Sequence, residues 1–188
     1  MRIVVGMTGG SCSIYGVALL KALEQMGVET HLVVSHMGAY VLEHECEMKL
    51  EDVKEMATFY YENNDLAASI SSGSFKTDGM VIIPCSMNTL AAVANGMSQN
   101  LVHRAADVVM KEGRKLVMVV RETPLSPIHL ENMLKLSKIG VTIMPASPGF
   151  YHKPQDISDL VNIMVGRTLD QLGLDSSIFK RWHSDQGL

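Results

Sequence analysis

The chain has few of the residues that mark several specialised classes of protein. Its 188 residues include three cysteines, Cys12, Cys46 and Cys85, with no C-x-x-C pair and no histidine at zinc-ligand spacing. Neither a disulfide framework nor a structural metal is therefore indicated. Lysine and arginine form no basic block, and the net charge is −4. A nucleic acid or an anionic membrane is accordingly not expected as a partner.

Long hydrophobic runs are also missing from the sequence. No run approaches the roughly 18 apolar residues that a membrane span requires, and the N-terminus lacks the charged-then-apolar pattern of a signal peptide. We therefore expect a cytoplasmic protein with no membrane partner. A hydrophobic fraction of 47% with 19% charged residues is typical of a globular protein. We expect a single domain over residues 1–188, with a C-terminal tail from about residue 173.

Short apolar runs alternate with helical patterns along the chain. Five runs have the continuous apolar character of parallel strands covered on both faces: Ile3–Met7, His31–Val34, Met80–Ile83, Leu116–Val120 and Val141–Met144. Helical periodicity follows in a first helix from an N-cap at Ser13 to a stop at Gly27, and then in Ala39–Glu45, Thr89–Ala94, Leu101–Lys111, Ile128–Ser137 and Ile157–Leu172. This alternation predicts a doubly wound α/β fold with a parallel sheet.

Ligands bind such sheets outside the carboxyl ends of the strands, so the loops that follow the strands are the candidate site. The first loop has adjacent glycines, Gly9 and Gly10, with hydroxyls at Thr8, Ser11 and Ser13 before a helix N-terminus. Such a loop suits a phosphate, although its spacing matches neither common phosphate-binding motif. A tight turn with a helix cap explains it equally well.

The second and third loops offer small polar groups. Ser35 either contacts a ligand or caps the next helix, and Glu45 taken alone would lie on a solvated helix face. Ser86, Asn88 and Thr89 form a turn that can present backbone and side-chain donors to an anion. We interpret Cys85 beside them as a small core residue.

The fourth and fifth loops carry charge and aromatic rings. Arg121 and Glu122 directly follow a buried strand, which suits a guanidinium for a phosphate and a carboxylate for proton transfer. An ion pair between loops is the simpler alternative. Phe150 and Tyr151 lie among three prolines on a stiff loop, where a packing role and a ligand contact are both open.

Taken together, these loops resemble the UbiX/Pad-type flavin prenyltransferases over nearly the whole chain. The segments that carry the resemblance are GMTGGSCSIYG, LVVSHMGAYVLEHE, IPCSMNTLAAVANG, NLVHRAADVVMKEGRKLVMVVRETPLSPIHLENM and PASPGFYHKPQDISDLVNIMVGRTLDQLGL. SISSGSFKTDGMVIIPCSM and KRW resemble the branch associated with phenolic-acid decarboxylases. The resemblance implies a flavodoxin-like (Rossmann-like) fold, reduced FMN, dimethylallyl phosphate, no metal and a homo-oligomer, a dodecamer in the family. It also implies a UbiD-type decarboxylase as the recipient of prenylated FMN.

The resemblance further assigns roles to particular residues. FMN would be lined by Gly9, Gly10, Ser11, Ser35, Ser86, Met87, Asn88, Thr89 and Arg121. The phosphate of dimethylallyl phosphate would be held by Tyr151, Arg167, Arg104 and Lys111, some of them from a neighbouring subunit. Glu122 would handle protons, Ser11 would act as a positioning group, and Glu45 and Trp182 also fall on functional positions.

The first loop departs from the family's usual G-A-S-G-A. Gly10 stands in place of alanine, and Cys12 and Ser13 stand in place of the last Gly-Ala pair. The side chain of Cys12 demands an ordinary helical or β conformation there. This altered loop is the one feature that favours a non-catalytic flavin carrier, against which Glu122 argues, because a carrier has no use for an acid–base group.

Asn88 stands where many family members have lysine. The turn around it resembles the related FMN-dependent cysteine decarboxylases, which gives a second alternative function. Those enzymes need a histidine about eight residues before the aspartate that precedes the third-loop strand. Counting back from Asp78 gives Ile70, with no histidine nearby, so the sequence favours the prenyltransferase.

Overall fold

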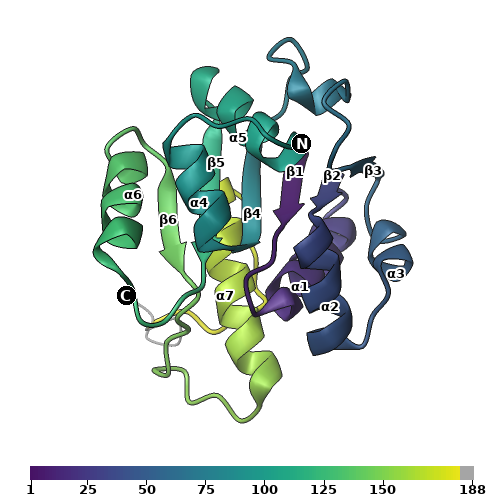
Figure 1. The fold of residues 1–188 in the computed structure, drawn as a ribbon. Coiled ribbons are helices and arrows are strands. Elements are labelled where there is room, and N and C mark those ends of the chain that lie inside the picture. Colours follow the sequence, from purple (N-terminus) through teal and green to yellow (C-terminus); the bar gives the residue numbers. More distant parts are fainter. Residues whose placement is uncertain (183–188) are drawn as a thin grey trace.

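Six parallel strands form one sheet in the order β3-β2-β1-β4-β5-β6 (Figure 1). The structure is a computed structural model, and it describes residues 1–182. The strands are β1 Arg2–Met7, β2 Glu29–Val34, β3 Phe59–Glu62, β4 Gly79–Cys85, β5 Lys115–Val120 and β6 Thr142–Pro145. The order places β1 and β4 side by side at the centre, and the chain proceeds from them in opposite directions. The predicted doubly wound α/β fold is confirmed, and its ligand crevice lies outside the carboxyl ends of these two strands.

The helices form two layers over the sheet. They are α1 Ser13–Gln25, α2 His36–Cys46, α3 Leu50–Lys54, α4 Met87–Ala94, α5 Leu101–Lys111, α6 Pro127–Ser137 and α7 Ile157–Leu172, with a short 3-10 turn, η1, at Ser69–Ser71. One buried core joins the sheet to α1, α2, α3 and α7, and the other joins it to α4, α5 and α6. The sheet is therefore covered on both faces, which explains why its inner strands read as continuous apolar runs.

The five predicted strands are all present, with ends shifted by one or two residues, and β3 is an additional strand. β3 has the sequence FYYE and pairs only with β2 at the edge of the sheet. Its partial exposure removes the continuous apolar signal that identified the others. The predicted strand Met80–Ile83 ends too early, because β4 continues through Pro84 and pairs with β5 again at Cys85 after a shift in register.

Two predicted helix starts are also wrong, and α3 was not predicted. The predicted Ala39–Glu45 helix begins earlier, at His36, because the Ser35 hydroxyl caps α2. The predicted Thr89–Ala94 helix begins at Met87, because Ser86 caps α4. Both serines therefore sit where a strand ends and a helix N-terminus faces the crevice.

Two buried histidines give the fold a dependence on pH. His31 is 1% exposed, and its ring nitrogens lie 2.9 Å from the Tyr61 hydroxyl and 2.8 Å from the Glu29 carboxylate. Burial lowers the pKa of His31, and hydrogen bonding to Glu29 only partly opposes this effect. Burial also lowers the pKa of His103 on α5. Its Nδ1 has no hydrogen-bond partner within residues 1–182.

We expect the free energy of unfolding to fall as the pH drops below about 6.5, the ordinary pKa of histidine. Because burial lowers both folded-state pKa values, the unfolded chain takes up protons first, so the neutral imidazoles stabilise the fold fully only above the unfolded pKa. Urea unfolding curves across this range measure the change. The variant His103→Leu removes one titrating group and should flatten part of the decline. An unfolding midpoint that does not depend on pH would contradict the expectation.

Candidate active site

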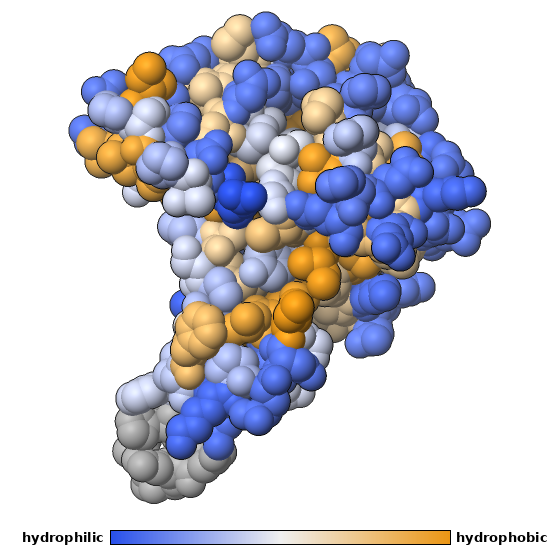
Figure 2. All heavy atoms as spheres, turned by 60° about the horizontal axis from the view of Figure 1, so that its bottom comes forward, coloured by the Kyte–Doolittle hydropathy of each residue, from blue (hydrophilic) through white to orange (hydrophobic). Residues whose placement is uncertain are grey.

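A cavity of about 350 Å³ lies at the carboxyl edge of the sheet, and we call it the central pocket. Its lining comes from α2 and from three strand-end loops: Gly9, Gly10, Ser11, Val41, His44, Glu45, Ser86, Met87, Arg121 and Glu122. Figure 2 brings this edge of the molecule forward and shows apolar side chains gathered across it. Val41 and His44 are the lining residues that sequence reasoning missed, because neither carries a signal outside its place on α2.

The first loop is locked between the second and third loops. Thr8 donates its hydroxyl to the Pro84 carbonyl at 3.0 Å and accepts from the Ser86 amide at 2.9 Å. A Cβ on Gly9 would lie 2.7 Å from the Cβ of Met37, which is closer than real side chains pack. A Cβ on Gly10 would lie 3.4 Å from the Pro84 Cβ, an ordinary contact. Of these two residues, only Gly9 is therefore required to be glycine by close approach, and alanine fits at Gly10.

We expect Gly9→Ala to destabilise the protein by about 1–3 kcal/mol, the usual cost of overpacking, and to reduce FMN retention. The reason is that the new methyl group pushes the first loop away from Met37 and distorts the wall of the central pocket. Gly10→Ala is the matched control and should change stability by less than about 0.5 kcal/mol. Urea unfolding and the flavin content after gel filtration measure both effects. Equal behaviour of the two variants would show that the close approach does not matter.

Glu45 binds the N-terminus of α1. Its carboxylate accepts from the backbone amides of Cys12 at 2.8 Å and Ser13 at 3.0 Å, and from the Ser11 hydroxyl. The interpretation of Glu45 as a solvated side chain is incomplete. Although it is exposed, its carboxylate accepts hydrogen bonds from backbone amides that have no partner within the helix, and its negative charge interacts favourably with the positive end of the helix dipole. Part of the anion-binding capacity of the first loop is thus used by the chain's own carboxylate.

The backbone at Cys12 differs from the sequence prediction. Cys12, not Ser13, precedes the first helical residue, and it adopts a left-handed conformation with φ 78° and ψ 38°. The expectation of an ordinary helical or β conformation at Cys12 is therefore wrong. Ser13 begins the helix with a buried hydroxyl that has no hydrogen-bond partner among residues 1–182. The three contacts of Glu45 hold this strained turn in place.

The serines of the second and third loops act as helix caps in this structure. The Ser35 hydroxyl accepts from the Gly38 amide at 3.0 Å, and the Ser86 hydroxyl accepts from the Thr89 amide at 3.3 Å. Thr89 is buried, whereas Asn88 is exposed at the start of α4. The Ser86 hydroxyl also donates to the Thr89 hydroxyl at 3.1 Å. Each capping hydroxyl retains a second lone pair, so capping does not exclude a ligand.

Arg121 and Glu122 reach the central pocket from the end of β5. The Glu122 carboxylate accepts from the Thr123 amide at 3.0 Å. Within residues 1–182 the Arg121 side chain has no ion-pair or hydrogen-bond partner, and the two charges do not pair with other loops. The alternative of a structural ion pair is therefore absent from the described chain. A guanidinium without a partner beside a carboxylate suits binding of a phosphate and transfer of a proton.

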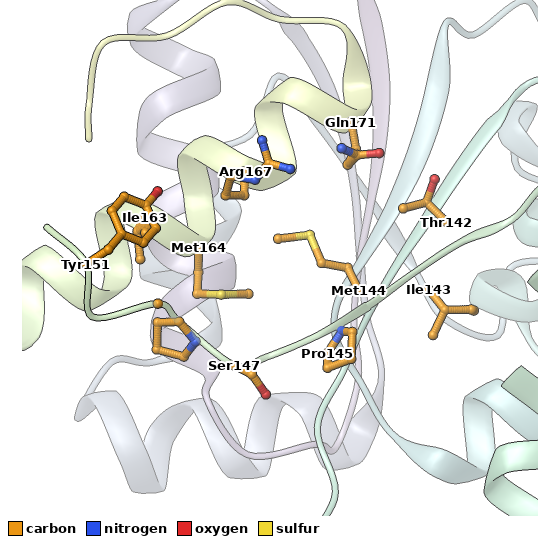
Figure 3. Close-up of a pocket in the computed structure, with 12 residues that line it drawn as sticks. Thr142, Ile143, Met144, Pro145, Ser147, Tyr151, Ile163, Met164, Arg167 and Gln171 are labelled. Atoms are coloured by element: carbon orange, nitrogen blue, oxygen red, sulfur yellow. The ribbon is translucent and has the colours of Figure 1, made fainter. Parts of the chain in front are cut away.

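A second cavity of about 410 Å³ lies between β6, α7 and the loop that joins them, and we call it the lateral pocket (Figure 3). Tyr151, from the loop, and Arg167, from α7, both line it. Their assignment to the phosphate of dimethylallyl phosphate stays a prediction. Arg167 donates to Asp170 at 2.9 Å. The Trp182 ring meets the Tyr151 ring edge to face, with centroids 5.4 Å apart. Met144 and Met164 supply apolar wall, and no sequence pattern indicated them.

Arg104 and Lys111 line neither the central pocket nor the lateral pocket of their own chain. Arg104 donates to the Ser71 carbonyl at 3.1 Å and pairs with Asp107 at 2.8 Å. Lys111 pairs with Glu112 at the end of α5, close to the start of β5. Their assignment to the phosphate of dimethylallyl phosphate stays a prediction.

Residues 1–182 contain neither a cluster of metal-ligating side chains nor a helix that could span a membrane. No group of three or more histidine, cysteine or acidic side chains within residues 1–182 is arranged to hold a metal ion. In the same part of the chain, no helix is long and apolar enough to cross a bilayer. Cys85 is fully buried, and burial raises the pKa of its thiol, so its interpretation as a core residue is confirmed.

A doubly wound sheet with a glycine pair, capped helix N-termini and, within residues 1–182, an unpaired guanidinium at its carboxyl edge is typical of nucleotide-binding α/β proteins. The chain matches the Flavoprotein family over residues 1–169. It is 51% identical over 183 residues to a probable UbiX-like flavin prenyltransferase of Bacillus subtilis, covering 97% of this chain and 90% of that protein. The chain therefore belongs to the UbiX-like flavin prenyltransferases. This confirms the family resemblance that the strand-end loops indicated.

Solved structures agree with this family. A dodecameric FMN-dependent UbiX-like decarboxylase from Escherichia coli O157:H7 superposes with a TM-score of 0.96 at 53% identity, with full coverage of both chains. AnUbiX in complex with FMN and dimethylallyl pyrophosphate superposes with a TM-score of 0.95 at 47% identity, covering 96% of each chain. The FMN-dependent cysteine decarboxylase SpaF reaches a TM-score of 0.61 at 14% identity, which shows a shared fold alone.

Proposed function

We propose that this chain transfers a dimethylallyl group from dimethylallyl phosphate to N5 and C6 of reduced FMN, as a cytoplasmic enzyme, and supplies prenylated FMN to a UbiD-type decarboxylase. The observation that carries the proposal is the pair of charges in the central pocket, Arg121 and Glu122, neither of which forms an ion pair within residues 1–182. A packing role leaves charges paired, whereas these two face a cavity beside the glycine loop. Membership of the flavin prenyltransferases supports the same reaction.

The central pocket fits FMN by the chemistry of its donors. Gly9 and Gly10 line the pocket with backbone rather than side chains, and the N-termini of α2 and α4 point positive ends toward the crevice. Arg121 supplies a guanidinium, the group best suited to phosphate. Ser35, Ser86, Met87, Asn88 and Thr89 complete the proposed FMN set. Reduced FMN supplies the nucleophilic N5 and C6 atoms.

Proton transfer is assigned to Glu122, and the positioning of the reacting face to Ser11. The transfer breaks the carbon–oxygen bond to phosphate, forms the bond to N5 and releases the N5 proton. Glu122 lines the pocket as an exposed carboxylate and can accept that proton. The Ser11 hydroxyl is oriented by its hydrogen bond to Glu45. Ring closure at C6 moves one more proton within the prenylated product, so the net gain is one C5H8 unit.

The lateral pocket suits the departing phosphate and the allylic carbon. Arg167 offers positive charge to the leaving phosphate, and the Tyr151 and Trp182 rings offer aromatic faces to developing cation character. Arg104 and Lys111 are held away from the pockets of their own chain, so in the proposed homo-oligomer they serve the pocket of a neighbouring subunit. A dodecameric relative at 53% identity supports such an assembly. Residues 1–188 act as one flavoprotein domain.

Anaerobic release of inorganic phosphate tests the reaction. Purified protein with reduced FMN and dimethylallyl phosphate should release one phosphate for each flavin consumed. Oxidised FMN, whose imine-like N5 is electrophilic rather than nucleophilic, is the control and should release none. The flavin product should then restore activity to an apo UbiD-type decarboxylase. Protein that binds reduced FMN without releasing phosphate would contradict the proposal and favour a flavin carrier.

A further inference from the structure

Asp170 on α7 connects the lateral pocket to the C-terminal segment, which we define as residues 174–182. One of its oxygens accepts from Arg167 at 2.9 Å and also from Arg181 at 2.9 Å. Its other oxygen accepts from Arg181 at 2.7 Å. The Asp170 side chain is 15% exposed. The largely buried carboxylate of Asp170 thus binds both Arg167, which lines the lateral pocket, and Arg181, which lies eleven residues after Asp170.

A second contact fixes the same segment to α7. The ring of Phe179 packs on the backbone of Gly166, where a Cβ would lie only 2.1 Å from a ring carbon. The Arg181 guanidinium lies over the Phe179 ring, 4.9 Å from its centroid. The two contacts lie on either side of Arg167 along α7, so the segment follows the helix past the lateral pocket. Trp182 comes next in the chain and meets Tyr151.

We propose that Asp170 is a positioning residue for the proposed prenyl transfer: it aims Arg167 at the lateral pocket and clamps Arg181, so that Trp182 is held against Tyr151. This inference rests on the proposed function. Arg181 is bound through both carboxylate oxygens, whereas Arg167 is bound through one. A bidentate pair is the stronger of the two. A phosphate that enters the pocket can therefore draw Arg167 away while the clamp on Arg181 stays closed.

The charge of Asp170 suits this double role. Hydrogen bonding to Arg181 is the main cause that lowers the pKa of Asp170 below its usual value, with the charges of both arginines adding to it. The carboxylate therefore remains ionised well below neutral pH and keeps both guanidinium groups oriented. Without it, Arg167 and Arg181 would repel each other and the C-terminal segment would lose its ionic contact with α7.

Trp182 is the single tryptophan of the chain, so its fluorescence reports on the clamp directly. In Asp170→Asn and in Arg181→Gln, we expect the time-resolved anisotropy decay of Trp182 to gain a fast component. The KM for dimethylallyl phosphate should rise about tenfold, as for loss of one charge-assisted contact, while FMN affinity stays unchanged. Asp170→Glu, which keeps the carboxylate, should bring the Trp182 decay and the KM for dimethylallyl phosphate part of the way back to the wild-type values. Glu131→Gln removes an exposed carboxylate on α6, in the helix layer on the other face of the sheet from α7, and as the control it should change neither the anisotropy decay nor the KM.

Gly166→Ala tests the clamp without touching a charged group. Its methyl group displaces Phe179, so the fast component in the Trp182 decay should appear again. An unchanged Trp182 decay and an unchanged KM in folded Asp170→Asn would overturn the inference. Failure of the proposed function can be distinguished from failure of this inference, because wild-type protein would then show no prenyl transfer. The anisotropy decay of Trp182 would still decide whether Asp170 holds the C-terminal segment.

Discussion

Replacement of Glu122 by glutamine is expected to lower the rate of prenyl transfer by a factor of about 10²–10⁴ and to leave FMN binding intact, the usual range for a residue that transfers protons. Glutamine keeps the carbonyl oxygen that accepts from the Thr123 amide, so the loop geometry at the end of β5 should persist. What is lost is the basic oxygen that faces the central pocket. Single-turnover formation of prenylated flavin measures the rate, and fluorescence titration measures FMN affinity.

Glu131→Gln is the matched control for this experiment. Glu131 is an exposed carboxylate on α6 and does not line the central pocket, so its loss should leave both the rate and the affinity unchanged. A Glu122→Gln variant as active as the wild type would remove Glu122 from the reaction. A variant that loses FMN affinity and rate together would assign Glu122 to binding rather than to chemistry.

Replacement of Glu45 by alanine is expected to destabilise the protein by about 1 kcal/mol, similar to loss of a helix cap, and to slow prenyl transfer by about tenfold or more, as for a lost positioning contact. The reason is that Glu45 satisfies the amides of Cys12 and Ser13 and orients the Ser11 hydroxyl at the pocket wall. Without it, the left-handed turn at Cys12 loses the contacts that hold it. Urea unfolding and single-turnover kinetics measure the two effects.

Glu43→Ala is the matched control, because it removes one negative charge from α2 without removing the contacts of Glu45 with the N-terminus of α1. Glu43 is exposed on the same helix, two residues away, with no side-chain contact to the first loop among residues 1–182. We expect that variant to match the wild type in stability and rate. The account of Glu45 would be contradicted if the two variants behaved alike, or if Glu45→Ala kept full activity.

The sheet could be predicted from the sequence because burial on both faces makes its inner strands continuously apolar. β1, β4 and β5 are buried along almost their whole length, so their composition alone identifies them. β3 has two exposed residues in four and carries no such pattern. The far end of β4 was missed because Pro84 follows Ile83 and proline is uncommon inside a strand, whereas here β4 resumes its pairing at Cys85.

Site residues that directly follow a strand end could be predicted from the sequence. Residues whose role depends on a contact with a distant part of the chain could not. Arg121 and Glu122 come straight after β5, so topology alone carries them to the crevice. Glu45 reaches the α1 N-terminus only because α2 packs beside α1. The same contact supports the left-handed Cys12, which no local pattern indicates.

The measurement that tests the central claim most directly is the mass of the flavin after anaerobic incubation of the protein with reduced FMN and dimethylallyl phosphate. The account predicts a gain of one C5H8 unit in wild-type protein, and a strongly reduced yield in Glu122→Gln at equal FMN occupancy. Unmodified FMN recovered from wild-type protein that binds both compounds would contradict the account.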